Sequence, residues 1–192
     1  MKKISLPERK KAQKIELIIH DALHYFEKNG YYNTTVEQLC DAAMISTSTF
    51  FNYFGTKEKV VELIMEDGLK DFREIIEKSM AEEPDPFDAM SKSMMFLCGQ
   101  LRKYCNTVSA YFSLTLQNDE FRKVILDHST MAADMVLEAF AKSGRTCPLS
   151  RDLLIDVLGG CITNPFLLLP PEKAAARAKE SMAEIIEVLR NH

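Results

Sequence analysis

The sequence predicts an all-α protein of about nine helices. Apolar residues recur at helical spacing from one end of the chain to the other, whereas the alternation typical of strands is nearly absent. Glycine and proline fall between these periodic stretches and mark the helix ends. With 192 residues, the chain is long enough to bury a core without stabilisation by a metal ion or disulfide bonds.

The first helix is predicted by an apolar stripe that closes at Asn29-Gly30, where glycine tolerates the left-handed conformation of a C-cap. The stripe consists of Ile15, Ile18, Ile19, Ala22, Leu23 and Phe26.

A short second helix is expected to begin at Thr34, which stands three residues before Glu37 and so forms a capping box, and to run to about Ala42. After a tight connection at 43–46, Ser46 is expected to cap a third helix through about Tyr53. The apolar residues that join the two helices are Val36, Leu39, Ala43, Ile45, Phe50 and Phe54.

A long fourth helix is expected to start at Lys57, after Gly55-Thr56, and to end before a break in which Asp85 caps the next helix and Pro86 occupies its first turn. Later helices are predicted at 86–104, 107–116, 119–143, 149–168 and 171–190. Pro165 should kink or end its helix. These elements divide into a domain at 1–56 and a second domain at 57–192.

The formal net charge of −4 hides a polarity along the chain. The first 60 residues hold nine basic and seven acidic side chains, and the remainder holds 15 and 21. The N-terminal unit is therefore +2 and the rest −6. A local positive field on an acidic molecule is compatible with nucleic-acid binding by one end only.

Composition and motifs exclude several other classes of protein. Five scattered cysteines without a CxxC pair favour neither a disulfide framework nor a zinc site. His20 and His24 share a helix face but lack a third ligand, so we expect no metal and no cofactor. The chain has no phosphate-binding loop or nucleophile motif, which argues against an enzyme. No apolar run approaches the roughly 18 residues of a membrane span, so a cytoplasmic protein is expected.

The second and third predicted helices form a helix-turn-helix unit, because a turn of about four residues joins them. The third helix presents Thr47, Ser48, Thr49 and Asn52, which are all short and polar. Such side chains bring a helix close to base edges in a major groove about 12 Å wide. The unit is a binding surface and not an active site.

At these residues the chain resembles the tetracycline-repressor (TetR) family of bacterial transcriptional regulators. The resemblance covers about the first quarter to third of the chain and runs through Ile15–Phe26, Gly30, Thr34–Val36, Leu39, Ala43, Ile45-Ser46, Thr49–Phe54 and Thr56–Glu58. Three residues depart from the family pattern. Met44 stands where the family favours glycine in the turn, so a strain of about 1 kcal/mol is expected if its φ must be positive. Phe51 stands where tyrosine is usual, and Cys40 stands where alanine is usual.

The resemblance implies that the third helix reads bases, that Thr35 and Tyr53 contact phosphates, and that Lys57 does so at the start of the fourth helix. For Thr34 an N-cap role is favoured over a DNA contact. The full set of expected DNA-binding residues is Thr35, Val36, Ser46, Thr47, Ser48, Thr49, Asn52, Tyr53 and Lys57.

The family also encloses an effector cavity in its C-terminal region, and the soft and aromatic residues of this chain suit an apolar or amphipathic ligand. The expected ligand-binding residues are Phe72, Met90, Met94, Tyr104, Tyr111, Phe112 and Phe121. The alternative for each of them is an ordinary place in the core.

By the same resemblance, apolar stripes on the last two helices are assigned to a two-fold homodimer that matches a palindromic operator. The stripes consist of Leu154, Val157, Leu158, Cys161, Met182, Ile185, Ile186 and Leu189. Burial inside a single chain is the competing interpretation.

The function expected from the sequence is that of a DNA-binding transcriptional regulator, a repressor that a small effector releases from double-stranded DNA. Two alternatives remain open: a protein-interaction module of the same fold that does not bind DNA, and a small-molecule-binding or catalytic helical bundle.

Overall fold

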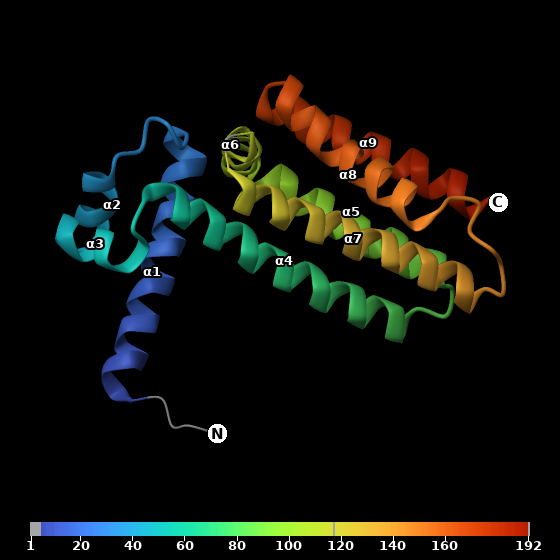
Figure 1. Ribbon diagram of the computed structural model, residues 1–192, viewed down its shortest axis with the longest axis horizontal. Helices are drawn as coiled ribbons and strands as arrows, with labels where there is room; N and C mark the ends of the chain where they lie inside the picture. Colours follow the sequence, from blue (N-terminus) through green and yellow to red (C-terminus); the bar gives the residue numbers. More distant parts are fainter. Residues whose placement is uncertain (1–4, 117, 192) are drawn as a thin grey trace. The chain divides into compact units, whose positions relative to one another are not determined.

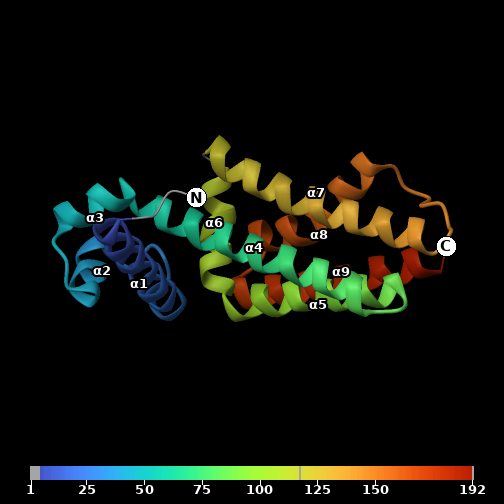
Figure 2. The same ribbon diagram turned by 90° about the horizontal axis from the view of Figure 1, so that it is seen from below.

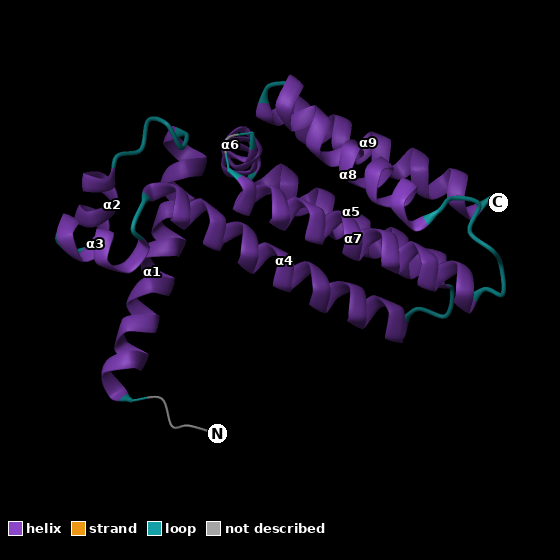
Figure 3. Ribbon diagram, viewed as in Figure 1, coloured by secondary structure: helices purple, strands orange, loops and turns teal. Residues whose placement is uncertain are grey.

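The computed structural model describes residues 5–116 and 118–191, and every regular element within those ranges is a helix (Figure 3). The all-α prediction is confirmed for this part of the chain. The chain divides into two compact units, one ending at Ile64 and the other beginning at Met65. We describe each unit by itself.

The N-terminal unit contains α1 (Leu6–Asn29), α2 (Val36–Ala43), α3 (Thr47–Phe54) and the first turns of α4 (Lys57–Glu82), as Figure 1 shows. Helix α1 begins nine residues before Ile15, where the apolar stripe starts. Its start follows from a local signal, because Ser5 and Glu8 form a capping box and Pro7 lies in the first turn. Arg9, Lys10, Lys11 and Lys14 therefore belong to a helix that extends beyond the core.

The capping box of α2 is displaced by one residue from the predicted position. The N-cap is Thr35, whose hydroxyl accepts from the Gln38 amide while Gln38 Oε1 accepts from the Thr35 amide. Thr34 is instead buried, and its hydroxyl lies 2.9 Å from the Gly30 carbonyl oxygen. The sequence permits both boxes, and the burial of Thr34 selects the second.

The core of this unit joins the three helices through apolar side chains. Ile18, Ala22 and Phe26 of α1 are fully buried, as is Phe50 of α3. A polar contact adds to this packing, because Lys14 of α1 donates from Nζ to the Ala43 carbonyl at the C-terminal end of α2, at 2.5 Å. A cation at that end satisfies an unpaired carbonyl and matches the helix dipole.

The second unit contains the rest of α4 together with α5 (Pro86–Lys103), α6 (Cys105–Thr115), α7 (Asp119–Lys142), α8 (Arg151–Leu168) and α9 (Pro171–Arg190). Within it α7 packs against α8, α8 against α9, and α5 against both α9 and α7. Figures 1 and 2 show α6 running across one end of these helices.

Pro165 lies in the last turn of α8, and the helix ends at Leu168. Because proline has no amide hydrogen, it removes one helical hydrogen bond near the end of the helix. The Leu169 amide donates to the Pro165 carbonyl at 2.9 Å and forms the last turn. The prediction that Pro165 marks a helix end is confirmed within one turn.

None of the helices in the described part of the chain is long and apolar enough to cross a membrane.

Candidate functional site

The exposed face of α3 is a row of short polar side chains. Thr47, Ser48 and Asn52 are exposed, and Thr49 is half-buried. Ser46 caps the helix, since its hydroxyl accepts from the Thr49 amide at 3.1 Å. Successive members lie one helical turn apart or less, so they form one surface that offers hydroxyl and amide groups to a partner.

The turn between α2 and α3 requires Met44 to adopt a left-handed conformation, with φ 51° and ψ 52°. The Ile45 amide donates to the Cys40 carbonyl at 3.0 Å, which fixes the turn. The Met44 side chain is 88% exposed and contributes no packing in return. The strain expected from methionine in place of glycine at this position is therefore present.

The N-terminal end of α2 lies in the same unit as α3 and offers a second set of polar groups. Thr35 is exposed, and Val36, the first residue of the helix, is half-buried. The amides of a helix N-terminus carry partial positive charge. The structure thus leaves the Thr35 side chain accessible, as a phosphate contact would require.

The aromatic residues of α3 divide between the core and the surface. Phe54 is 6% exposed and packs against Phe50, with ring centroids 5.0 Å apart. Tyr53 is half-buried, and Lys11 Nζ lies 5.3 Å from its ring centroid. Phe51 is 50% exposed and offers no hydroxyl. The Lys11–Tyr53 contact brings the basic part of α1 to the edge of the α3 surface.

Lys57 has a different environment from the one that its proposed phosphate contact implies. Its Nζ donates to the carbonyls of Tyr31 and Thr34, at 3.0 and 2.9 Å, and lies 4.0 Å from the centroid of the Tyr31 ring. Burial lowers the pKa of Lys57, although Glu58 opposes this shift. The ammonium therefore connects α4 to the α1–α2 loop in this structure.

The neighbouring Glu58 strengthens the same connection. Tyr31 donates from its hydroxyl to Glu58 Oε1 at 2.9 Å, and burial together with this bond raises the pKa of Tyr31 well above its usual range. Burial by itself would raise the pKa of Glu58, but hydrogen bonds from its own backbone amide, Tyr31 and Thr56 bring it below the ordinary value. Glu58 is thus charged at neutral pH.

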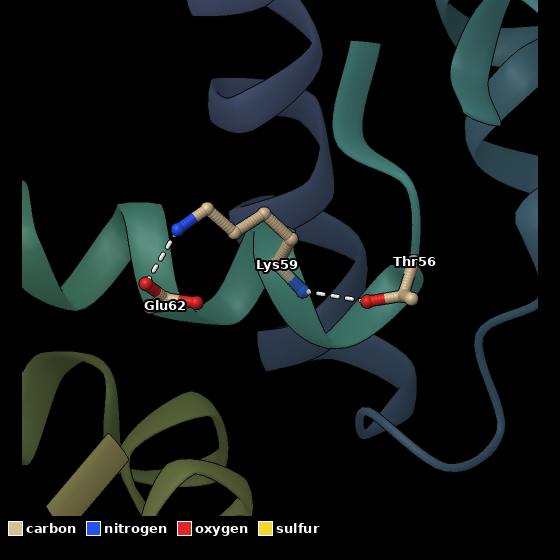
Figure 4. Close-up of polar contacts among 3 residues, drawn as sticks. All are labelled: Thr56, Lys59 and Glu62. Carbon is tan, nitrogen blue, oxygen red and sulfur yellow. Dashed lines mark hydrogen bonds and ion pairs between the residues drawn. The ribbon is translucent and has the colours of Figure 1, made fainter. Parts of the chain in front are cut away.

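The start of α4 is also capped, as Figure 4 shows. Thr56 Oγ1 accepts from the Lys59 amide at 3.2 Å. Lys59 Nζ lies 2.5 Å from Oε1 of Glu62, whose side chain is buried. These contacts hold the first turns of α4 in place next to the candidate interface.

A separate cavity of about 60 Å³ lies within the second unit. Two of the seven expected ligand-binding residues line it, Tyr111 and Phe112. The other lining residues are Met65, Leu97, Leu101, Ile125, His128, Ser129, Ala132, Leu158, Gly159, Ile162 and Thr163. His128, Ser129 and Thr163 could not be predicted as lining residues from the sequence, because a polar residue of a helix is assigned to the surface by default.

The remaining expected ligand residues do not line this cavity. Phe72, Met90 and Met94 are buried core residues, which was the alternative that the sequence left open. Tyr104 is half-buried at the end of α5, with Lys103 Nζ 4.7 Å from its ring centroid. Phe121 falls in α7, but its side chain lies outside the described residues.

The residues assigned to a dimer interface divide into buried and partly exposed side chains. Five of their residues are already buried within the single chain: Leu154, Leu158, Met182, Ile186 and Leu189. Val157, Cys161 and Ile185 are partly exposed. The first two line an open groove between α8 and α9, together with Gly160, Asn164 and the 79%-exposed Leu168. The accessible face of α8 is thus turned away from the predicted Leu154–Leu158 stripe.

The helix-turn-helix unit matches a known family. Residues 18–64 match the profile of bacterial regulatory proteins of the tetR family. The chain is 28% identical over 131 residues to the HTH-type transcriptional regulator HbdR of Aromatoleum sp. (strain CIB), covering 68% of this chain and 56% of HbdR. It is 33% identical over 97 residues to TcmR of Streptomyces glaucescens, covering 50% of this chain and 42% of TcmR. The chain spans about half the length of these relatives.

A solved structure extends the likeness to the second unit. The fold is similar to that of Thermus thermophilus FadR, a TetR-family transcriptional repressor solved with lauroyl-CoA. The TM-score is 0.67 at 19% identity, covering 90% of this chain and 93% of FadR. At that identity the likeness concerns the fold alone. The helix-turn-helix unit is therefore similar to that of the tetR family of bacterial regulatory proteins, and the fold of the chain is similar to that of a solved TetR-family repressor.

Proposed function

We propose that this protein is a sequence-specific DNA-binding transcriptional repressor that a small effector releases from a palindromic operator. The observation that carries the proposal is the exposed polar face of α3 within a helix-turn-helix unit of tetR type. Hydroxyl and amide side chains on such a helix hydrogen-bond to base edges, while the helix backbone enters the major groove.

Contacts to the DNA backbone come from groups around α3. Thr35 and Ser46 lie at helix N-termini, where amides attract phosphates. Tyr53 and the basic side chains of α1 extend this surface, since Lys11 lies against the Tyr53 ring. Lys57 acts here mainly by holding α4 to the Tyr31–Thr34 loop, so its effect on DNA binding is one of positioning.

Effector binding is assigned to the cavity of the second unit. Helix α4 is the element that couples it to α3, because residues 57–64 belong to the first unit while Met65, on the same helix, lines the cavity. An effector acts only if it binds one conformation of α4 more tightly than the other.

The homodimer is assigned to the exposed face of α8. Val157, Cys161 and Leu168 are apolar side chains on this face, and Gly160 permits close approach of another helix. A two-fold dimer has two α3 helices, which predicts an operator with two symmetric half-sites.

The test is selection of bound duplexes from a random pool by the purified chain. We expect a palindromic sequence to be enriched, and the variant Ser48→Ala with Asn52→Ala to lose at least about tenfold in affinity for it. Lys28→Ala, a change of an exposed residue at the other end of α1, serves as the matched control and should bind normally. Absence of any enriched duplex would contradict the proposed function.

A further inference from the structure

The cavity of the second unit is lined almost entirely by apolar and aromatic side chains. Tyr111 and Phe112 offer aromatic surfaces, and Leu101 and Ile125 are typical of the remaining lining. None of the described residues that line it is a lysine, arginine, aspartate or glutamate. A ligand with a phosphate or carboxylate inside this cavity would therefore lack a counter-charge and lose its hydration without compensation.

His128 is the only lining residue of the described part that has an imidazole, and its hydrogen bonding defines which proton it holds. Nδ1 lies 2.8 Å from the Val124 carbonyl oxygen, which can only accept. Nδ1 therefore carries the hydrogen. Burial lowers the pKa of His128, so the ring is neutral at pH 7 and Nε2 holds a lone pair. No described residue is a hydrogen-bond partner of Nε2.

The other polar lining groups add to this pattern. Ser129 donates its hydroxyl proton to the Ile125 carbonyl at 3.0 Å, so toward the cavity it too is an acceptor. Thr163 is on the facing helix α8 and lines the same cavity. The cavity thus pairs an apolar body with hydrogen-bond acceptors, to which a ligand that carries a donor can bind.

We infer that this cavity binds an uncharged aromatic molecule bearing a hydroxyl group, and that His128 Nε2 accepts the hydrogen bond from that hydroxyl. The inference names the effector class of the proposed repressor and in that sense rests on the proposed function. Ligand binding is nevertheless measurable without DNA.

The experiment is calorimetric titration of the full chain with matched ligands. We expect 4-methylphenol to bind at least about tenfold more tightly than 4-methylanisole, which has the same ring but no donor. The anionic probes 4-methylbenzoate and lauroyl-CoA should bind more weakly than 4-methylphenol. Equal affinity for the phenol and the ether, no binding of the phenol, or tighter binding of either anion would overturn the inference.

Two variants test whether His128 Nε2 is the atom that accepts the hydrogen bond from the ligand. His128→Phe keeps an aromatic ring but removes the nitrogen, and it should bring the phenol-to-ether affinity ratio to about one while 4-methylanisole still binds. His24→Phe, the same substitution at an exposed histidine of α1, is the matched control and should leave the ratio near that of the native chain. A native phenol-to-ether ratio in His128→Phe would overturn the role of His128. If His128→Phe fails to fold, the ligand pair on the native chain still decides the ligand class.

The repressor function and the ligand class can be contradicted independently of each other. A chain that binds 4-methylphenol but enriches no duplex contradicts the repressor function and supports the ligand class. A chain that enriches a palindromic duplex but does not bind 4-methylphenol contradicts the ligand class alone.

Discussion

At the scale of single residues, the clearest loss of stability comes from the backbone conformation of Met44. A left-handed conformation at a residue other than glycine costs about 1 kcal/mol, and the exposed Met44 side chain recovers none of it. The residue is tolerated because the turn between α2 and α3 needs this backbone shape. The cost is thus paid in stability at the point where the candidate DNA surface is formed.

We expect Met44→Gly to raise the free energy of unfolding by about 1 kcal/mol, because glycine adopts φ 51° without strain. Urea denaturation measures the change. Met44→Ala is the matched control: it removes the same exposed side chain, retains the strain and should leave stability nearly unchanged. A gain in Met44→Ala equal to that in Met44→Gly would show that the side chain, and not the backbone, is responsible.

His128 predicts an acid sensitivity of the second unit. Burial lowers its pKa below the ordinary 6.5, and Arg73 lowers it further, whereas the Val124 carbonyl and Asp127 raise it. Below pH 6.5 the unfolded chain therefore binds a proton that the folded chain does not. The stabilisation is complete above pH 6.5 and is lost as pH falls toward the folded pKa.

Denaturation of the native chain and of His128→Phe between pH 7.5 and 5 measures this contribution. We expect the native chain to lose up to about 1.4 kcal/mol per pH unit relative to the variant once pH is below about 6.5. Parallel stability curves for the two proteins would contradict the prediction.

At the scale of elements, α7 and α8 approach closely at Gly159. A Cβ added there would lie 2.6 Å from Ser129 Oγ and 3.3 Å from Ser129 Cβ. Alanine normally stabilises a helix interior by up to about 1 kcal/mol over glycine. At Gly159 we expect the clash to outweigh this gain, so Gly159→Ala should lower the free energy of unfolding.

The comparison is with Gly99→Ala in α5, where nothing lies within 4 Å of the added Cβ and a gain is expected. Adding Ser129→Ala to Gly159→Ala should restore part of the loss, since it removes the shorter contact. Equal gains from Gly99→Ala and Gly159→Ala, measured by urea denaturation, would show that α7 and α8 separate freely.

The N-terminal half of α1 is expected to contribute phosphate contacts. Arg9 and Lys10 are exposed on this half, and Lys11 lies against Tyr53 at the edge of the α3 surface. Replacing Arg9 and Lys10 by alanine should reduce the salt dependence of duplex affinity by up to about 0.9 per lost contact in a plot of log K against log salt.

The control for that experiment is Lys78→Ala with Lys123→Ala, which removes two exposed lysines from the second unit. It should leave the salt dependence unchanged. Ser48→Ala with Asn52→Ala should instead reduce the preference for the selected sequence at nearly constant salt dependence, since base contacts specify and phosphate contacts position. An equal loss of salt dependence in the Arg9–Lys10 variant and in the Lys78–Lys123 variant would contradict a role for α1.

At the scale of the whole molecule, the proposed DNA binding depends on charge and assembly. The first 60 residues carry +2 and the remainder −6. In the proposed function, the acidic remainder limits nonspecific association with the duplex, and the basic residues of α1 act next to α3. The global net charge therefore says little about nucleic-acid binding by this chain.

The proposed dimer is tested on the accessible face of α8. Val157→Glu with Leu168→Glu should yield a monomeric mass in light scattering at micromolar concentration, because a like charge would meet its symmetry mate at a two-fold interface. Leu126→Glu, at a similarly exposed residue of α7, is the control and should remain dimeric. A native chain that is monomeric under these conditions would refute the dimer.

Features that depend on local chemistry could be predicted from the sequence. Periodicity, caps and helix breakers located the helices, and the short polar residues of α3 marked the candidate DNA surface, because these signals act over a few neighbouring residues. The same locality explains the misplaced α2 cap, since both threonines offer a capping box and only the burial of Thr34 distinguishes them.

Tertiary structure alone decided which apolar and polar side chains meet. Packing buried Leu154 and Leu158 within the chain and left Val157 and Leu168 accessible. It also brought His128 of α7 to the same cavity as Thr163 of α8. Lys57 forms hydrogen bonds to carbonyls 23 and 26 residues earlier in the chain. The helical period reports that a face is apolar but not what covers it, because that depends on residues distant in sequence.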